Sequence, residues 1–192
     1  MGGGILANSR DIGLIIVFAV ILVVFRLLIG RIVVMIQIPP FGSSIGYLLS
    51  IFYSIIHSLA FLMYKGKRWR LFSQALLSTL LYLIFVNPTI QGTEMATLTS
   101  LFIVDVVFNS FYGIFEQKKK LLWLIIIFQV YYWATHAIWN LLFLSIFLYP
   151  FEGLMNNWFI PAMLILIPIM VIEGLIGGYT GYKIFRRVEK IV

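Results

Sequence analysis

The chain contains no cysteine and few charged residues, and acidic residues are only half as numerous as basic ones. Without a thiol, disulfides, thiolate-ligated metals and thiol catalysis are excluded. Charged residues make up 11% of the 192 residues, 62% are hydrophobic, and the mean hydropathy is +1.04. This polar surface is too small to cover a soluble globule of that size. The composition therefore predicts a single integral membrane domain over residues 1–192.

Motifs of the common enzyme classes are also missing. The sequence has no His-Glu-x-x-His motif, no Gly-x-Ser-x-Gly elbow and no phosphate-binding Gly-x-x-x-x-Gly-Lys-Ser/Thr loop. With two histidines and no cysteine, a transition-metal site would depend on carboxylates. We therefore expect a chain that is not an enzyme and carries neither cofactor nor metal. Energy for uphill transport would come from ion coupling or from a separate subunit.

Six long apolar stretches fill most of the chain and predict an all-α, polytopic bundle of six transmembrane helices. The first stretch is interpreted as a retained helix rather than a signal peptide, because Arg26 and Arg31 follow it where cleavage would need small residues. The expected helices are Asp11–Ile29, Gly46–Tyr64, Leu71–Val86, Thr97–Phe115, Leu121–Tyr149 and Trp158–Phe185.

Basic residues lie in alternate loops, which predicts the orientation of the chain in the membrane. Lys65–Arg70, Lys118–Lys120 and the carboxyl-terminal tail hold most of the positive charge. Such loops remain in the cytoplasm, so we expect a multi-pass cell-membrane protein with both termini cytoplasmic. The net charge of +7 favours contact with anionic lipid headgroups over nucleic acid, because the basic residues form no stripe on a soluble domain.

The segment Arg31–Ile45 is apolar but is interrupted by Pro39-Pro40 and Gly42-Ser43-Ser44. These residues force an extended or turning path, and the apolar part is too short to span a bilayer. One interpretation is a partly re-entrant loop between helices 1 and 2 that covers the outer mouth of the bundle. The alternative is a surface loop, although exposing its apolar side chains to water would be unfavourable.

Four residues of the fifth predicted helix, Gln129, Trp133, His136 and Asn140, recur at spacings that place them on one face. Polar groups inside a membrane are costly and need a reason. An aromatic and hydrogen-bonding stripe of this kind suits an organic ring that carries polar groups. The alternative is that these side chains hydrogen-bond to neighbouring helices and hold the bundle together.

Asp105 and Asn109 lie one turn apart near the middle of the fourth predicted helix. A carboxyl group there is neutral, paired or in contact with water. Asp105 is therefore either a ligand contact or a structural carboxylate, with Arg26 or His136 as possible partners. His57 is expected to be a structural histidine.

The sixth predicted helix carries Glu173, Gly174, Gly177, Gly178 and Gly181 near its cytoplasmic end. Small residues four apart let another helix approach closely. These glycines either pack the helix within the chain or dock a separate membrane subunit. Glu173 would pair with a basic residue of that partner, or within the chain.

Taken together, the layout resembles the substrate-binding S component of energy-coupling factor transporters, which are small six-helix proteins that bind a vitamin or similar micronutrient for import. The resemblance implies a membrane T component and cytoplasmic ATPase subunits as partners, and a site in the outer half of the bundle. One departure is the first helix, which has only Gly13 and Ala19 where the family often has small residues four apart. The resemblance rests on Arg10-Asp11-Ile12, Pro39-Pro40-Phe41-Gly42, the Asp105 region before a Lys-rich turn, and Glu173-Gly174-Leu175-Ile176-Gly177-Gly178 followed by Tyr182-Lys183.

The candidate substrate-binding residues offer aromatic faces, hydrogen bonds and an acid, which suit a cationic or electron-poor heteroaromatic such as a thiamine-like vitamin. Two other function classes remain open. A small scaffold of envelope assembly would turn its polar residues toward partner helices, and a lipid-modifying intramembrane enzyme would bring Asp105, Glu173 or His136 together for acid–base chemistry. The candidate residues are Asp105, Asn109, Gln129, Trp133, His136, Asn140, Glu152 and Trp158.

Overall fold

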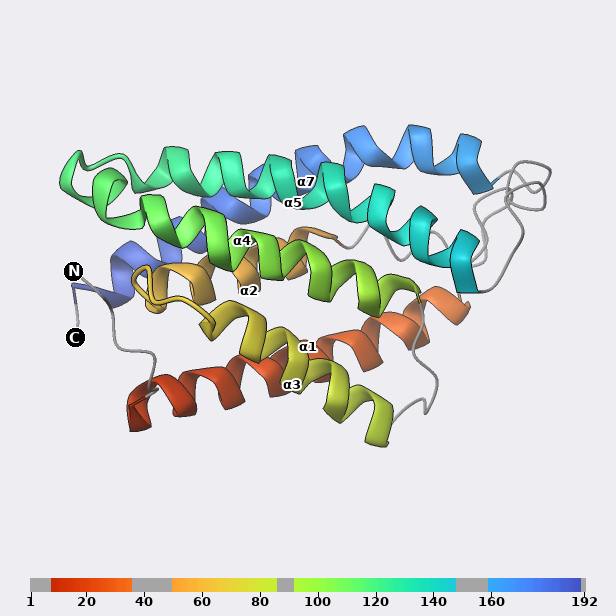
Figure 1. Cartoon of the computed structure of the whole chain (residues 1–192), viewed down its shortest axis with the longest axis horizontal. Helices are drawn as coiled ribbons and strands as arrows, with labels where there is room; N and C mark the ends of the chain where they lie inside the picture. Colours follow the sequence, from red (N-terminus) through yellow and green to blue (C-terminus); the bar gives the residue numbers. More distant parts are fainter. Residues whose placement is uncertain (1–7, 36–49, 86–91, 148–158, 191–192) are drawn as a thin grey trace.

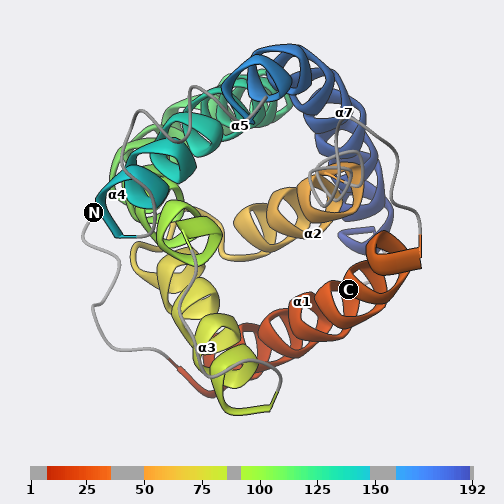
Figure 2. The same cartoon turned by 90° about the vertical axis from the view of Figure 1, so that its right-hand side faces the viewer.

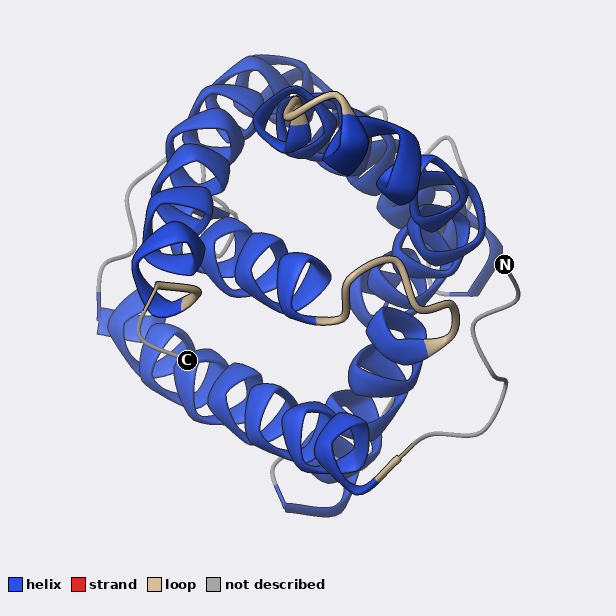
Figure 3. Ribbon diagram, turned by 90° about the vertical axis from the view of Figure 1, so that its left-hand side faces the viewer, coloured by secondary structure: helices blue, strands red, loops and turns tan. Residues whose placement is uncertain are grey.

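The computed structural model describes residues 8–35, 50–85, 92–147 and 159–190, and within these ranges it is all-helical. Figure 3 shows helices and no strand in the described part of the chain. The all-α prediction is therefore confirmed. The helices are α1 (Ser9–Met35), α2 (Ser50–Met63), α3 (Arg70–Phe85), α4 (Gly92–Gln117), α5 (Leu121–Phe147) and α7 (Phe159–Val188).

The segment expected to be re-entrant is only partly visible. Its first residues, 31–35, continue α1 as helix, so the helix ends later than the sequence predicted. The rest of that segment lies outside the described residues, as do the candidate site residues Glu152 and Trp158.

Four of the described helices are long and apolar enough to cross a membrane. Their apolar spans are Ser9–Leu28, Glu94–Gln117, Leu121–Asn140 and Leu164–Val188. The other two helices are shorter, since α2 has 14 residues and α3 has 16. At a rise of about 1.5 Å per residue they reach roughly 21 and 24 Å, against a bilayer core of about 30 Å. These lengths indicate a multi-pass membrane protein whose helices differ in reach.

Helix α2 lies inside the bundle and the other five helices surround it (Figure 2). Around the ring α1 packs against α3, α3 against α4, α4 against α5, and α5 against α7, while the main partner of α2 is α7. Seen from the side, α2 begins part-way along the bundle (Figure 1). Its first residue, Ser50, accordingly bonds to Glu173 near the middle of α7. The described part of α2 therefore lies toward the end of the bundle where α1 begins and α7 ends (Figure 1).

The outward faces of the ring carry large apolar side chains. On α1, Ile16 and Val20 lie one turn apart and are exposed, and so are Ile84 at the end of α3, Trp123 on α5 and Leu164 on α7. Exposed apolar surface of this extent is unfavourable in water and is the normal surface of a protein in lipid. The arrangement agrees with the hydropathy of the sequence.

Glycines on α7 allow its backbone to lie directly against α2. A Cβ added at Gly177 would meet the carbonyl oxygen of Ile51 at 2.5 Å, and one at Gly181 would meet that of Ile55 at 2.8 Å. Gly174 abuts the indole of Trp133, and a Cβ on the adjacent helical face at Gly178 would meet Gln129 Cγ at 2.8 Å. All four glycines are buried in contacts with α2 or α5. The sequence left two roles open for these glycines, and the contacts in the structure are those of packing within the chain.

A buried charge cluster joins α1 to the turn between α2 and α3. Asp11, at the start of α1, accepts hydrogen bonds from Lys67 Nζ at 2.8 Å and from Arg70 Nε at 3.2 Å. Both Asp11 and Arg70 are buried. The turn itself is tight, because Gly66 has a positive φ of 74° and its Cα faces the ring of Tyr112. Only glycine adopts this conformation without strain in so little space.

Candidate functional site

The four-residue stripe on α5 faces the interior of the bundle. Gln129, Trp133, His136 and Asn140 are all buried, with at most 5% of each residue exposed. The spacing argument therefore identified the inward face of α5 correctly. Whether these residues bind a ligand depends on what each of them contacts.

The first two residues of the stripe hydrogen-bond to α2. Trp133 Nε1 donates to the hydroxyl of Ser54 at 2.6 Å. Gln129 Nε2 donates to the hydroxyl of Ser58 at 2.6 Å and to the carbonyl oxygen of Ser54 at 3.2 Å. Bonds between buried polar groups of neighbouring helices stabilise a membrane bundle. For Gln129 and Trp133, the packing alternative accounts for the donor atoms.

The imidazole of His136 lies one turn further along and has a different environment. Its ring stacks on Tyr132, with centroids 5.5 Å apart, and meets Trp133 edge-on at 5.6 Å. His57 of α2 contacts the same Tyr132 ring at 5.4 Å. The Nδ1 atoms of both histidines are buried without a hydrogen-bond partner among the described residues. Buried polar atoms in this state are uncommon and mark a place where water or a ligand would bond.

Asp105 and Asn109 do not join this group. The Asp105 carboxylate accepts a hydrogen bond from the backbone nitrogen of Phe72 at 2.8 Å, in the first turn of α3, and another from Asn109. Asn109 also donates to the carbonyl oxygen of Lys67 at 3.2 Å. A carboxylate at this position satisfies backbone donors that a helix leaves free at its N-terminus.

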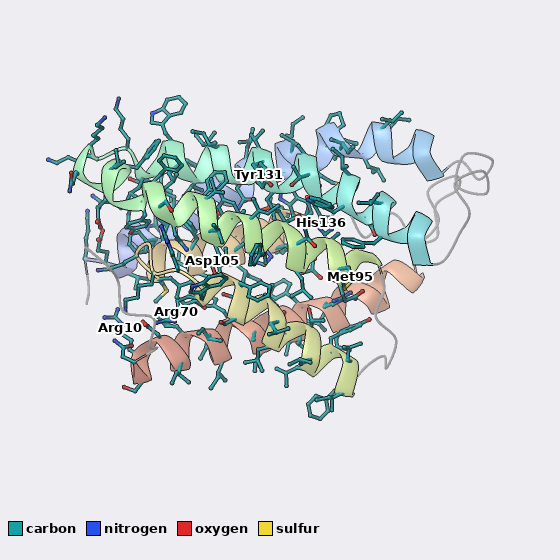
Figure 4. All side chains as sticks on the ribbon, in the orientation of Figure 1. Arg10, Arg70, Met95, Asp105, Tyr131 and His136 are labelled. Carbon is teal, nitrogen blue, oxygen red and sulfur yellow. The ribbon has the colours of Figure 1, made fainter. Side chains whose placement is uncertain are left out.

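Of the two alternatives for Asp105, these contacts fit a structural carboxylate. Its partners differ from the ones that were expected. Neither Arg26 nor His136 bonds to it. In Figure 4, Asp105 lies toward the end of the bundle that holds Arg70, whereas His136 lies toward the end that holds Met95. The sequence analysis placed Asp105 and His136 in one site because both lie within apolar helices, and the packing of α4 beside α3 separates them.

Nearby, the burial of the Tyr64 hydroxyl raises its pKa well above the usual range. The hydroxyl therefore stays protonated and donates to Gln74 Oε1 at 2.9 Å.

A second group of polar residues surrounds Arg26 of α1, and His136 is the one member of it that the sequence analysis assigned to the site. The Arg26 guanidinium forms an ion pair with Glu94 of α4 and lies over the ring of Tyr82 of α3, 3.9 Å from its centroid. Two further tyrosines and the His136 ring lie within electrostatic reach of it. We call this group the arginine–tyrosine cluster; it comprises Arg26, Tyr53, Tyr82, Glu94, Tyr132 and His136.

The sequence signal for this cluster was visible but incomplete. Arg26 is a cation within an apolar span, and such residues mark functional or paired positions by default. Glu94 lies in the first turn of α4 and is buried. Their pairing joins residues far apart in the chain, so it could not be read from spacing.

The remaining α7 residue of the predicted docking group, Glu173, bonds within the chain. One of its carboxylate oxygens accepts from the Ser50 hydroxyl at 2.6 Å and from the backbone nitrogen of Ile51 at 3.3 Å. Glu173 thus caps the N-terminus of α2 inside the bundle. The expected pairing with a basic residue is not what these bonds show, because both donors are neutral groups of α2.

Other chemistry finds little support in the part of the chain that is described. No three histidine, aspartate or glutamate side chains there come close enough to hold a metal ion. Asp105, Glu173 and His136 do not hydrogen-bond to one another, since the two carboxylates bond to α3 and α2 respectively.

No protein-family model, curated protein or solved structure matches this chain. Its function has to be inferred from the residues themselves.

Proposed function

We propose that this protein is the membrane-embedded substrate-binding subunit of a vitamin-type micronutrient import system, of the S-component kind. Separate ATPase subunits and a membrane T component energise it. The proposal includes six membrane crossings, a partly re-entrant loop after α1, and both termini in the cytoplasm of a cell-membrane protein. It is supported above all by one observation, which is that polar and aromatic side chains from five helices gather around Arg26 inside the bundle.

Packing between helices explains this gathering of polar side chains poorly. A charged side chain at the centre of a membrane helix costs about 2.5 to 3.5 kcal/mol on insertion scales. Arg26 and Glu94 offset part of this by pairing. The buried Nδ1 atoms of His57 and His136 still have no partner in the described part of the chain. An enclosed ligand with polar groups would bond to these atoms, and its ring would pack against Tyr132.

The two alternative functions fit the contacts less well. A scaffold that recruits partner helices through polar side chains would carry them on its outer faces, but Gln129, His136 and Asn140 face inward and the outer faces are apolar. An intramembrane enzyme using Asp105 and Glu173 would hold them near His136, and each carboxylate instead caps a helix.

Two measurements test the proposal. The tagged protein, extracted in mild detergent from its native cells, should copurify with an ATPase pair and a second membrane protein. The purified chain should gain thermal stability with one member of a vitamin panel, because a ligand at 100 times its Kd stabilises the folded state by about 2.7 kcal/mol. A set of compounds that leaves the melting temperature unchanged, together with the absence of ATPases from the purified material, would contradict it.

A matched pair of variants assigns any ligand effect to the interior. His136→Ala should weaken the stabilising effect, because it removes the ring that stacks on Tyr132. Ser110→Ala should leave it intact, because Ser110 is an exposed residue of α4 whose hydroxyl contacts Arg68. Equal ligand responses in both variants would place binding elsewhere.

A further inference from the structure

Arg26 projects toward the inside of the bundle. It follows Ala19 by seven residues and Leu22 by four, so the three share one face of α1. Ala19 and Leu22 are buried, whereas Val20 and Val24 on the opposite face are exposed. Among the described residues, the inward face of α1 therefore carries two charged side chains, Asp11 near its start and Arg26 further along.

Arg26 pairs with an acid and packs against a tyrosine within the described part of the chain. An arginine side chain has five N–H donors arranged in a rigid fork. Glu94 forms an ion pair with it and the ring of Tyr82 lies against it. The Arg26 side chain is 28% exposed, and that of Glu94 is 0% exposed. Of this ion pair, the Arg26 side chain keeps exposed surface and the Glu94 side chain keeps none.

Three tyrosines lie near the Arg26 side chain. Tyr53 of α2 and Tyr132 of α5 lie within electrostatic reach of it, and Tyr82 lies against its face. The His136 ring, with its unpaired Nδ1, stacks on the Tyr132 ring. A ring-bearing compound could therefore pack against tyrosine while an attached group reaches the guanidinium.

We infer that the substrate of this site is a ring-bearing micronutrient with a carboxylate group, which the Arg26 guanidinium receives. The inference rests on the proposed binding function and narrows its substrate class. Guanidinium and carboxylate form two parallel hydrogen bonds, so the fork supplies both charge and orientation. A cationic ligand would instead meet the partly exposed Arg26 side chain, while the Glu94 carboxylate that could attract it is buried. This replaces the cationic, thiamine-like class that the sequence suggested.

Matched pairs of compounds test the role of the carboxylate directly. The full chain, purified in detergent, is assayed by thermal shift and by titration calorimetry. The pairs are nicotinate with nicotinamide, biotin with biotin amide, and 4-aminobenzoate with 4-aminobenzamide. Thiamine and riboflavin represent vitamins without a carboxylate. We expect at least one acid to stabilise the protein and its amide to bind about tenfold to a hundredfold more weakly, as for the loss of a charge-assisted pair.

Variants then test Arg26 itself. The double variant Arg26→Gln with Glu94→Gln removes both charges, so no buried carboxylate is left unpaired, and it should bind the acid at least about tenfold more weakly. Arg26→Lys keeps the charge but loses the fork, and should give an intermediate loss. Arg68→Gln is the matched control, because Arg68 is exposed on the turn between α2 and α3. Circular dichroism and size exclusion establish that each variant is folded.

The outcomes separate this inference from the proposed function. Stabilisation by thiamine, riboflavin or an amide, with none by the acids, overturns the carboxylate assignment and leaves the binding function standing. An acid that binds the folded double variant or Arg26→Lys as well as it binds the wild type overturns the role of Arg26. A protein that responds to no compound of either kind overturns the carboxylate substrate class, and if it also copurifies with no ATPase the proposed function is refuted as well.

Discussion

The close contact between α7 and α2 makes a quantitative prediction about Gly177. The substitution Gly177→Ala would add a Cβ 2.5 Å from the carbonyl oxygen of Ile51 and 2.6 Å from the Cβ of Ser54. The first of these atoms belongs to the backbone and cannot rotate away. Helices α2 and α7 would have to separate, which would also move Ser54 relative to Trp133, its hydrogen-bond partner.

The size of the effect follows from comparison with a second glycine. Gly113 of α4 is helical and exposed, and an added Cβ would meet nothing within 4 Å. Replacing a helical glycine by alanine gains about 1 kcal/mol of helix propensity at either position. Overpacking a close contact costs about 1 to 3 kcal/mol. Since the propensity gain is common to both variants, Gly177→Ala should be less stable than Gly113→Ala by about 1 to 3 kcal/mol.

The free energy of unfolding is measured in mixed micelles by titration with a denaturing detergent, followed by tryptophan fluorescence and far-UV circular dichroism. Gly113→Ala should be as stable as the wild type or more stable. If Gly177→Ala matched Gly113→Ala in stability, the backbones of α2 and α7 would not be in contact at this position, and the central place of α2 would be wrong.

Three further predictions concern the bonds inside the bundle and its orientation. Trp133→Phe and Ser54→Ala should each lower the free energy of unfolding by about 1 kcal/mol. The double variant should lose little more than either single variant, because both substitutions remove the same hydrogen bond. Fully additive losses would show that this bond does not form. Asp105→Ala should lower it by about 1 to 3 kcal/mol, since the α3 N-terminus loses its acceptor, without changing the affinity for a stabilising compound; weaker ligand binding at wild-type stability would return Asp105 to the site. Because the chain has no native cysteine, Lys118→Cys should react with an impermeant maleimide only in inside-out vesicles and Phe85→Cys only in intact cells. The reverse labelling would invert the proposed orientation.

Local pattern was enough to find the inward face of α5. Gln129 and His136 stand seven residues apart, two helical turns, and both are buried. Periodicity reports which side chains share a face, but not what they meet there. Gln129 meets the hydroxyl of Ser58, and the Nδ1 of His136 meets no partner among the described residues. The stripe that looked uniform in the sequence therefore contains both packing contacts and candidate ligand contacts.

The carboxylates were harder to assign than the stripe. Asp105 and Glu173 both looked like functional acids because each interrupts an apolar helix. Each instead accepts hydrogen bonds from the first turn of another helix, through Phe72 in one case and Ile51 in the other. Helix ends always leave backbone donors free. Which acid meets which end depends on how the helices are arranged, and no spacing along the chain encodes it.

The sequence by itself determined that the chain is helical and that its outside is apolar. It also determined the positions of the basic loops and the side of α5 that turns inward. Hydropathy and charge patterns act over a few neighbouring residues, so local sequence is enough to read them. The tertiary structure decided that α2 is central, that the α7 glycines pack against it, and that Arg26 meets Glu94 among tyrosines. These contacts join residues dozens of positions apart. They form only when whole helices pack, since the close approach at each glycine fixes where every other side chain on the two helices can reach.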